Sequence, residues 1–165
     1  MMTKWDDELN RRMREVLSFD ARTGVFRNRF NRSTAKDGEV AGSVSDGYLI
    51  ISIDDKRYTA HRLAWFWIYG TVPTGDIDHI NGVRDDNRIT NLRAVSRSVN
   101  MQNQRRARSN NIHSGFLGVQ KNKDKWQALI RVNDRRICLG TYITPELAYC
   151  AYLDAKRKLH EGCAI

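Results

Sequence analysis

The feature that most constrains the fold is a short stretch beyond the middle of the chain that has neither acidic residues nor a regular apolar pattern. Residues 104–111 have the sequence Gln-Arg-Arg-Ala-Arg-Ser-Asn-Asn, a composition typical of a linker. Both flanking regions show the spacing of helices and strands, and 165 residues are enough for two small cores. We therefore expect two modules joined by a basic linker at 105–114. That linker is either a solvated tether or a segment that follows phosphates.

The first 75 residues predict a supporting α/β segment. Thr3 and Asp6 have the spacing of a capping box, and the apolar residues after them recur at helical intervals. Alternating apolar residues and polar turns predict hairpins, and a continuously apolar stretch that ends at Gly70 predicts a buried helix. The expected elements are a helix over residues 4–17, a strand over 25–30 after a turn at 20–24, strands over 48–53 and 57–60, and a helix over 61–69.

The charge of the chain indicates a polyanionic partner. The net charge is +9 and the pI is about 9.8, a balance typical of proteins that bind nucleic acid. No apolar run approaches the roughly 20 residues of a membrane helix, and the amino-terminal residues are polar and acidic rather than basic and then apolar. We therefore expect no membrane contact and no export signal, and action in the cytoplasm.

Three cysteines do not suggest a disulfide framework or a metal centre. Cys138, Cys150 and Cys163 are odd in number and widely separated, without a C-x-x-C pair. Structural zinc sites usually draw on closely spaced cysteine pairs. We expect reduced thiols and no structural zinc.

Residues 76–92 form an acidic island, with four aspartates and two arginines inside the basic chain. Asp78 stands directly before His79, and Gly82 follows in a turn. Hydrolysis of a phosphodiester needs an activated water and a cation that neutralises charge on the phosphate. Histidine titrates near neutral pH and suits the first task, while Asp and Asn oxygens are ligands that magnesium prefers. This segment therefore has the residue types for metal-assisted hydrolysis.

Three motifs in this region occur together at a specific spacing. They are D-H-x-x-G from Asp78, D-N-R-x-x-N-L-R from Asp86, and V-S-x-x-x-N ending at Asn100. In this combination they resemble the HNH endonucleases of the phage and intron homing type. The resemblance implies an α+β fold with a ββα-metal core over residues 76–104. Asp78 and His79 lie on its first strand, the second strand runs near 91–95, and a helix from Ser96 to about Gln104 carries Asn100.

The same resemblance implies roles for these residues. Asp78 and Asn100 would ligate one divalent cation, Mg²⁺ or Mn²⁺, and His79 would be the general base. Asn91 would hydrogen-bond across the loop and orient the histidine. The implied reaction is hydrolysis of a phosphodiester in double-stranded DNA by a homing or nicking endonuclease, in the bacterial host cytoplasm if the protein is phage-encoded. An isolated Asp-His pair also occurs in ordinary turns, so the nuclease interpretation depends on the three motifs occurring together.

His61 and Arg62 precede the predicted buried helix in a context that also resembles these nucleases. We interpret His61 as a structural histidine. Arg62 is either a phosphate contact near the site or a structural residue, and Arg93 is a further candidate for DNA contact.

The region after the linker predicts three antiparallel strands and one helix. The strands are expected over residues 116–120, 126–132 and 136–140, and Thr144 with Pro145 marks a helix start. If Trp126, Ala128 and Ile130 face the helix, alternation turns Gln127, Leu129 and Arg131 outward.

Residues 115–162 resemble the DNA-binding domain of plant ethylene-response factors through G-V, W-x-A-x-I-R, L-G-T-Y and the Ala-rich helix. The resemblance implies a sheet that lies in the DNA major groove. Leu117, Gln120 and Cys138 stand where the plant domains carry Arg, Arg and Trp, so their target sequence does not carry over. The candidate DNA contacts from the linker and this module are Arg105, Arg106, Arg108, Lys121, Lys123, Lys125, Gln127, Arg131 and Arg136.

Two other functions remain open at this point. One is a DNA-binding regulator whose nuclease module is inactive, which the presence of Asp78, His79 and Asn100 disfavours. The other is an RNA-binding protein, which lacks support because no outward aromatic pairs for base stacking are evident. We expect a monomer on DNA, with a dimer as the alternative.

Overall fold

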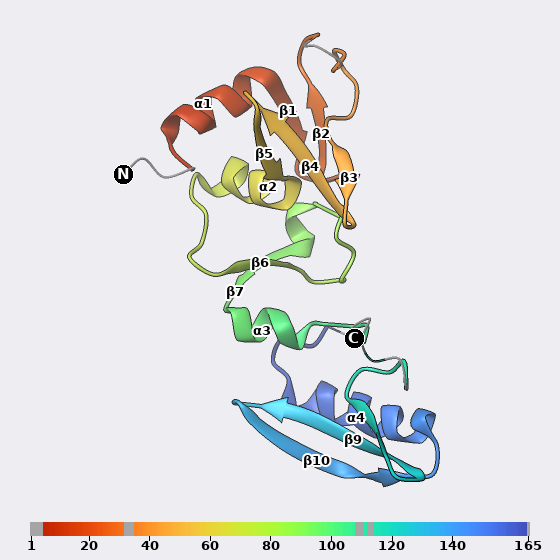
Figure 1. Cartoon of the computed structure of the whole chain (residues 1–165). Coiled ribbons are helices and arrows are strands. Elements are labelled where there is room, and N and C mark those ends of the chain that lie inside the picture. The colour runs from red at the N-terminus through yellow and green to blue at the C-terminus, as the bar shows by residue number, and fades with distance from the viewer. Residues whose placement is uncertain (1–4, 32–34, 108–110, 112–113, 165) are drawn as a thin grey trace. The chain divides into compact units, whose positions relative to one another are not determined.

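The computed structural model describes residues 5–31, 35–107, 111 and 114–164. The chain has the predicted α+β fold, with helices and small antiparallel sheets (Figure 1). It divides into two compact units, Met1–Ser96 and Arg97–Ile165. The first unit ends at Ser96, before the segment in which the motifs place a helix.

The first unit begins with the amphipathic helix α1, Asp7–Val16. Its N-cap is Asp6, whose carboxylate accepts a hydrogen bond from the backbone N–H of Leu9 at 2.9 Å. Thr3, the other half of the expected capping box, lies outside the described residues. The helix starts three residues later than predicted, because Asp6 is its N-cap. Leu9, Met13 and Val16 are buried in the core of this unit.

Two small antiparallel sheets pack around this core. The first pairs β1, Leu17–Asp20, with β2, Val25–Asn28. The second has the order β3-β4-β5, in which β4, Tyr48–Ile53, lies between β3, Ser43–Ser45, and β5, Lys56–Thr59. Strand β3 was not predicted. Its three residues are all exposed, so this edge strand has no alternation of apolar and polar residues to mark it.

Helix α2, Ala60–Tyr69, is the predicted buried helix. Its residues Ala60, Leu63, Ala64 and Phe66 lie in the core. Gly70 ends the helix with a φ of 70°, the left-handed conformation that glycine adopts without a steric penalty.

Strands β6, Asp76–His79, and β7, Leu92–Val95, form the two-stranded antiparallel sheet that the motifs implied. The loop between them ends in a short 3₁₀ turn, Ile89–Asn91. The β1–β2 turn packs against this loop, because a Cβ at Gly24 would lie 2.4 Å from the backbone nitrogen of Arg88. Ile89 also donates its backbone N–H to the carbonyl of Ala21. The amino-terminal segment thus supports the loop of the candidate site.

The second unit contains the predicted three-stranded sheet and helix. Its strands are β8, Val119–Asn122, β9, Lys125–Val132, and β10, Arg135–Tyr142, with β9 in the centre. Helix α4, Pro145–Leu159, is capped by Thr144 as expected. Its core consists of Val119, Ala128, Ile130, Ala148, Tyr152 and Ala155.

Strand β8 starts later than predicted. Phe116 and Leu117 are apolar but pack against the core from the turn before the strand. Gly118 has a φ of 74° and lies against the ring of Tyr152, where a side chain would collide. The chain therefore turns at Gly118 and pairs with β9 only from Val119.

The short helix α3, Arg97–Gln102, also belongs to the second unit. Of the predicted linker at 105–114, residues 108–110 and 112–113 lie outside the described part of the chain. Asn111 and Ser114 hydrogen-bond to the carbonyls of Phe116 and Val119, which ties the end of this segment to the sheet. Among the described residues, no helix is both long and apolar enough to cross a membrane.

Candidate functional site

The β6–β7 pairing brings a carboxylate and a guanidinium together. Asp78 and Arg93 lie directly opposite each other in the register. Oδ2 of Asp78 accepts hydrogen bonds from Nε and from a terminal nitrogen of Arg93, at 2.9 Å and 2.8 Å. Asp78 is 7% exposed, so its charge is partly neutralised by this arginine within the protein. Arg93, expected as a DNA contact, is thus engaged with the proposed metal ligand.

His79 follows Asp78 on the strand and is 5% exposed. Its ring centroid lies 5.0 Å from that of His61 and 6.1 Å from that of Tyr48. These contacts leave the imidazole little rotational freedom. A general base needs such a fixed orientation, because the proton must be accepted along one direction.

The neighbouring Asn87 favours one tautomer of the His79 imidazole. Asn87 is buried, and its amide Nδ2 donates to the carbonyl of Asp85 at 3.0 Å. This bond turns Oδ1 of Asn87 toward Nε2 of His79, 3.4 Å away. Because an amide oxygen only accepts, Nε2 carries the hydrogen in the neutral ring. The lone pair is then on Nδ1, the nitrogen that can accept a proton.

The environment keeps His79 neutral. Burial lowers the pKa of His79, and this effect outweighs the Asn87 contact and the carboxylates of Asp78, Asp86 and Asp85, which raise it. A neutral imidazole at neutral pH is the form that acts as a base.

Asn91 closes the loop between β6 and β7. Its Oδ1 accepts the backbone N–H of Asn81 at 3.0 Å, and its Nδ2 donates to the carbonyl of Asp86 at 2.8 Å. Its own carbonyl accepts the backbone N–H of Ile80. These are cross-loop hydrogen bonds of the kind that the resemblance implied. They hold the segment that follows His79 against the segment that carries Asn87.

Asp86 makes the same loop rigid with its side chain. It accepts hydrogen bonds from the amide of Asn81 at 2.7 Å and from the guanidinium of Arg88 at 2.6 Å and 2.8 Å. These bonds lower the pKa of Asp86 to about 2, and the bond with Arg88 has the largest effect. The carboxylate therefore serves the loop as an ionised acceptor.

Two side chains near His79 were not anticipated from the sequence. Tyr48 comes from β4, and its ring lies near both His61 and His79. Arg84 is exposed, lies 4.9 Å over the ring of Tyr48, and donates to the carbonyl of Asp46. No motif links these positions. The β3–β4 turn and the loop after β6 bring them together only in the folded unit.

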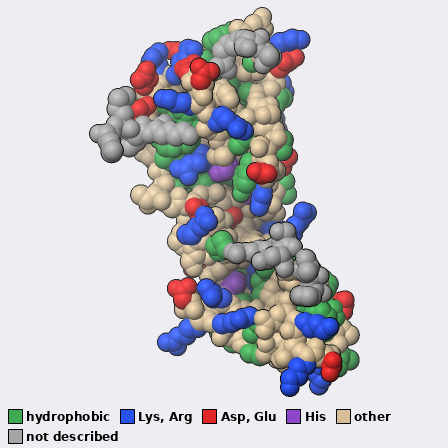
Figure 2. Space-filling view, in the orientation of Figure 1, with side chains coloured by type: hydrophobic (Ala, Val, Ile, Leu, Met, Phe, Trp, Pro, Cys, Tyr) green, Lys and Arg blue, Asp and Glu red, His purple; other side chains and the backbone are tan. Residues whose placement is uncertain are grey.

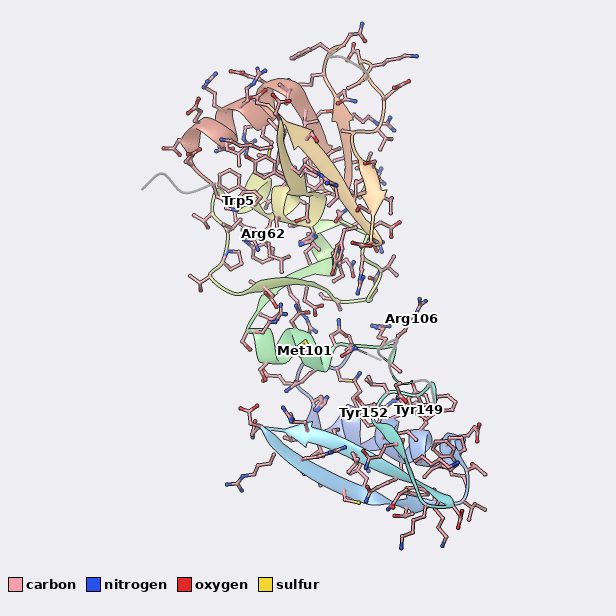
Figure 3. The ribbon with its side chains drawn as sticks, viewed as in Figure 1. Trp5, Arg62, Met101, Arg106, Tyr149 and Tyr152 are labelled. Atoms are coloured by element: carbon pink, nitrogen blue, oxygen red, sulfur yellow. The ribbon has the colours of Figure 1, made fainter. Side chains whose placement is uncertain are left out.

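His61 and Arg62 are both held inside the first unit. His61 is 9% exposed, and its Nδ1 has no hydrogen-bond partner among the described residues. Burial, and then the nearby His79 and Arg62, lower the pKa of His61 to about 3. Arg62 is half-buried, and its guanidinium lies 5.4 Å over the ring of Trp5 (Figure 3). These contacts support a packing role for His61 and also occupy one face of Arg62.

The neutral His61 gives a prediction for stability. In the unfolded chain His61 becomes protonated below its ordinary pKa near 6.5. In the folded protein it stays neutral until the pH approaches about 3. Stability therefore falls as pH drops through this window, by up to about 1.4 kcal/mol per pH unit for one group. We expect His61→Leu to flatten the pH dependence of the unfolding free energy between pH 6 and 4. Denaturant unfolding at several pH values measures the difference, and equal slopes for both proteins would contradict it.

The oxygen-rich character of the site fits a hard cation. Among the described residues, no three His, Cys, Asp or Glu side chains form a metal-binding group. The candidate donors are instead the buried carboxylate of Asp78 and, by its motif position, the amide oxygen of Asn100, which lies half-buried on α3. Carboxylate and amide oxygens with few protein ligands suit Mg²⁺, which retains several waters. Zn²⁺ prefers nitrogen and sulfur.

Residues 58–102 match the family model described as HNH endonuclease. The match begins in β5, ends with α3, and includes Asp78, His79, Asn91 and Asn100. It supports a nuclease of HNH type that acts on DNA. No curated protein and no solved structure matches the chain.

Outside the HNH segment, the outer face of the second unit's sheet carries a chain of polar contacts. Ala128 and Ile130 are buried against α4, so alternation turns Gln127, Leu129 and Arg131 to the other face as predicted. Arg136 donates to Oε1 of Gln120 at 2.7 Å, Gln120 donates to Gln127 at 3.0 Å, and Gln127 donates to Cys138 at 3.1 Å. Side chains from all three strands are thus connected by hydrogen bonds.

Two arginines on this face lie directly opposite each other. Arg131 and Arg136 are register partners on β9 and β10, and both are exposed. Like charges at opposed positions repel, so an anion placed between them would relieve the repulsion. A shallow hollow beside them is lined by Gln120, Leu129, Gly118 and Asn111. Figure 2 shows Lys and Arg side chains over the surface of the second unit, as a phosphate-binding surface requires.

The remaining predicted DNA contacts have different surroundings. Lys123 and Lys125 are exposed in and beside the β8–β9 turn. Lys121 is exposed but pairs with Trp126, so it lies on the helix side of the sheet and not on the face with Gln127. Arg105 is half-buried and donates to the carbonyl of Ala164. Arg106 is exposed, and Arg108 lies outside the described residues.

Proposed function

We propose that the protein is an HNH endonuclease that hydrolyses a phosphodiester bond in double-stranded DNA with one divalent cation, Mg²⁺ or Mn²⁺. The observation that carries the proposal is the arrangement around His79. A buried, neutral histidine is held by Asn87, next to a buried carboxylate, in a hairpin whose loop Asn91 closes. This arrangement lies within the segment that matches the HNH endonuclease family.

In the proposed reaction, Nδ1 of His79 accepts a proton from the attacking water. Asn87 holds the opposite ring nitrogen, and His61 and Tyr48 limit the rotation of the ring. Asp78 and Asn100 would hold the cation, which neutralises charge on the phosphate and on the leaving oxygen. The products would carry 5′-phosphate and 3′-hydroxyl ends, as the resemblance implies.

Arginines near the site suggest further contributions. Arg93 orients the carboxylate of Asp78 through two hydrogen bonds. Arg84 is exposed beside Tyr48, where a cation would attract the DNA backbone. We propose Arg84 as a phosphate contact, together with Arg62, whose guanidinium is only partly covered by Trp5.

We propose that the second unit binds DNA through the outer face of its sheet, as the plant-type resemblance implies. The support is the connected face of Gln120, Gln127, Arg136 and Cys138, and the opposed pair Arg131 and Arg136. Amide and guanidinium groups are the side chains that hydrogen-bond to base edges in the major groove. The exposed Lys123, Lys125 and Arg106 would add phosphate contacts.

Removing either opposed arginine is expected to weaken DNA binding and its salt dependence. Each lost phosphate contact should reduce the slope of log affinity against log salt by about 0.9. Arg131→Ala and Arg136→Ala are therefore compared with Arg135→Ala, an exposed arginine on the opposite face of the same sheet. Titration of a random-sequence duplex across a salt series measures the slopes. Parental affinities and slopes for both Arg131→Ala and Arg136→Ala would exclude these two arginines as phosphate contacts.

The proposed activity is tested with purified protein and supercoiled plasmid. With Mg²⁺ or Mn²⁺ we expect relaxed or linear product with mapped 5′-phosphate ends, and with a chelator no product. A monomer with one site would nick, whereas linear product at low enzyme concentration would indicate paired sites. DNA binding without cleavage under every metal condition would favour the alternative, a regulator with an inactive nuclease module. A homing or nicking role in a phage-infected cytoplasm is the biological setting that we propose.

A further inference from the structure

Helix α3 has little stability of its own. It contains six residues, Arg97–Gln102, and none of them is fully buried. Isolated helices shorter than about 12–15 residues are marginal in water, so a helix of this length depends on tertiary contacts. Met101 is exposed on its surface (Figure 3). The contacts that hold α3 in place must therefore come from neighbouring segments.

Three of these contacts come from the carboxyl-terminal end of the chain. The backbone N–H of Gly162 donates to Oε1 of Gln102 at 2.9 Å. The ammonium group of Lys156, on the last turn of α4, donates to the carbonyl of Gln104. The guanidinium of Arg105 donates to the carbonyl of Ala164 at 2.8 Å. Three hydrogen bonds thus join residues 102–105 to residues 156–164, more than 50 positions away in sequence.

Close packing accompanies these bonds. Gly162 is buried, and a Cβ at this position would lie 2.2 Å from the carbonyl oxygen of Val99 in the middle of α3. Lys156 is only 1% exposed, so its ammonium group cannot exchange the carbonyl of Gln104 for bulk water. The tail reaches α3 through a tight turn in which Cys163 donates its backbone N–H to the carbonyl of His160.

The same tail is anchored to the sheet. Nε2 of His160 lies 2.9 Å from the carbonyl oxygen of Arg131 on β9. The tail therefore contacts α3 at one end and the proposed DNA-binding sheet at the other. A displacement of α3 or of the sheet would shift residues 156–164, because interiors packed this closely transmit strain.

We propose that residues 156–164 position helix α3, and with it Asn100, so that the proposed metal ligand depends on the carboxyl-terminal unit. This inference rests on the proposed function of Asn100. Lys156 and Gly162 act as positioning residues and touch neither substrate nor cation. The second unit is then more than a module that selects DNA, because it also holds the helix that completes the nuclease motif.

The test uses full-length protein with substitutions at the contact. Gly162→Val places a side chain against the backbone of Val99, and Lys156→Met removes the donor to Gln104 but keeps a long apolar side chain. Matched controls are Glu161→Ala and Lys158→Met, which change exposed neighbours of these two positions. Amide hydrogen exchange of residues 97–104 is measured without DNA or metal. Cleavage of supercoiled plasmid is measured at saturating DNA across a magnesium titration.

We expect exchange of residues 97–104 to become about tenfold faster or more in both variants, while β9 and β10 keep their protection. Cleavage should fall by about 10²-fold with a shift to higher magnesium, because small displacements of a catalytic group have effects of that size. Duplex affinity should stay near the parental value.

Unchanged exchange in 97–104 would overturn the anchoring, and faster exchange with parental cleavage and metal dependence would overturn the positioning role. If the parental protein cleaves no DNA under any metal condition, the proposed function fails instead. The exchange experiment still decides the anchoring in that case. Loss of protection in β9 and β10 as well would show that the whole unit unfolds, and would contradict a specific effect on α3.

Discussion

Replacing His79 with alanine is expected to lower the single-turnover rate of DNA cleavage by about 10²–10⁴-fold, the usual contribution of a general base. The affinity for DNA should stay nearly unchanged. The reason is that His79 is buried and held by Asn87, His61 and Tyr48 rather than exposed as a phosphate contact. Its proposed work is on water, which adds little to ground-state binding. Cleavage of end-labelled duplex and a parallel binding titration measure the two effects.

Asn87→Ala provides a graded companion to this variant. It removes the acceptor beside Nε2 of His79 while leaving the imidazole in place. The cleavage rate should fall, but by less than in His79→Ala, because the imidazole remains present while its tautomer and orientation are less well fixed. Cleavage at the parental rate by His79→Ala would exclude the histidine as base and would remove the main support for the proposed mechanism.

Replacing Asp78 is expected to have the second large effect, on metal dependence. Asp78→Ala removes the buried carboxylate, so residual cleavage should need on the order of 10²-fold more Mg²⁺ or Mn²⁺. It also removes the oxygen that accepts two hydrogen bonds from Arg93. Loss of a charged hydrogen bond of this kind should destabilise the first unit by about 1–3 kcal/mol.

Two further variants separate the metal effect from the loss of stability. Asp78→Asn keeps an oxygen that can accept from Arg93 but removes the negative charge, so it should retain more stability than Asp78→Ala and still shift the metal titration. Asp85→Asn changes an exposed carboxylate in the same loop and should titrate like the parent. A parental metal titration for both Asp78 variants would remove Asp78 as a ligand.

Much of the fold was predictable because its signals are local. The alternation of Trp126 to Arg131 predicted both the central strand and its two faces, since a strand turns successive side chains to opposite sides. Gly70 marked a helix end through its backbone preference, and Thr144 marked a helix start through the side-chain oxygen that caps it. The errors occurred where local signals are weak, at the fully exposed edge strand β3 and at the start of β8, where Phe116 and Leu117 are partly buried without being in a strand.

The candidate site was predictable only in part. The resemblance of the motifs to HNH endonucleases predicted Asp78, His79 and Asn91 as site residues, and the pairing of β6 with β7 places them in one hairpin. Asn87 lay inside the motif, but its contact with His79 needed the observed loop conformation. Tyr48, Arg84 and the engagement of Arg93 by Asp78 depend on pairing across the folded unit, which no spacing rule reports.

The residue types, the apolar spacing of the elements and the motifs that resemble HNH endonucleases could be recognised along the chain, because each depends on neighbours in the sequence. Which groups surround His79, and which distant residues contact α3, follows from pairing and packing between segments that are far apart in the sequence. The motif groups Asn100 with the strands before it, yet the buried Lys156 and Gly162 tie its helix to the opposite end of the chain. A six-residue helix is not stable by itself, so it depends on segments that pack against it. Which segments these are is determined by the tertiary fold.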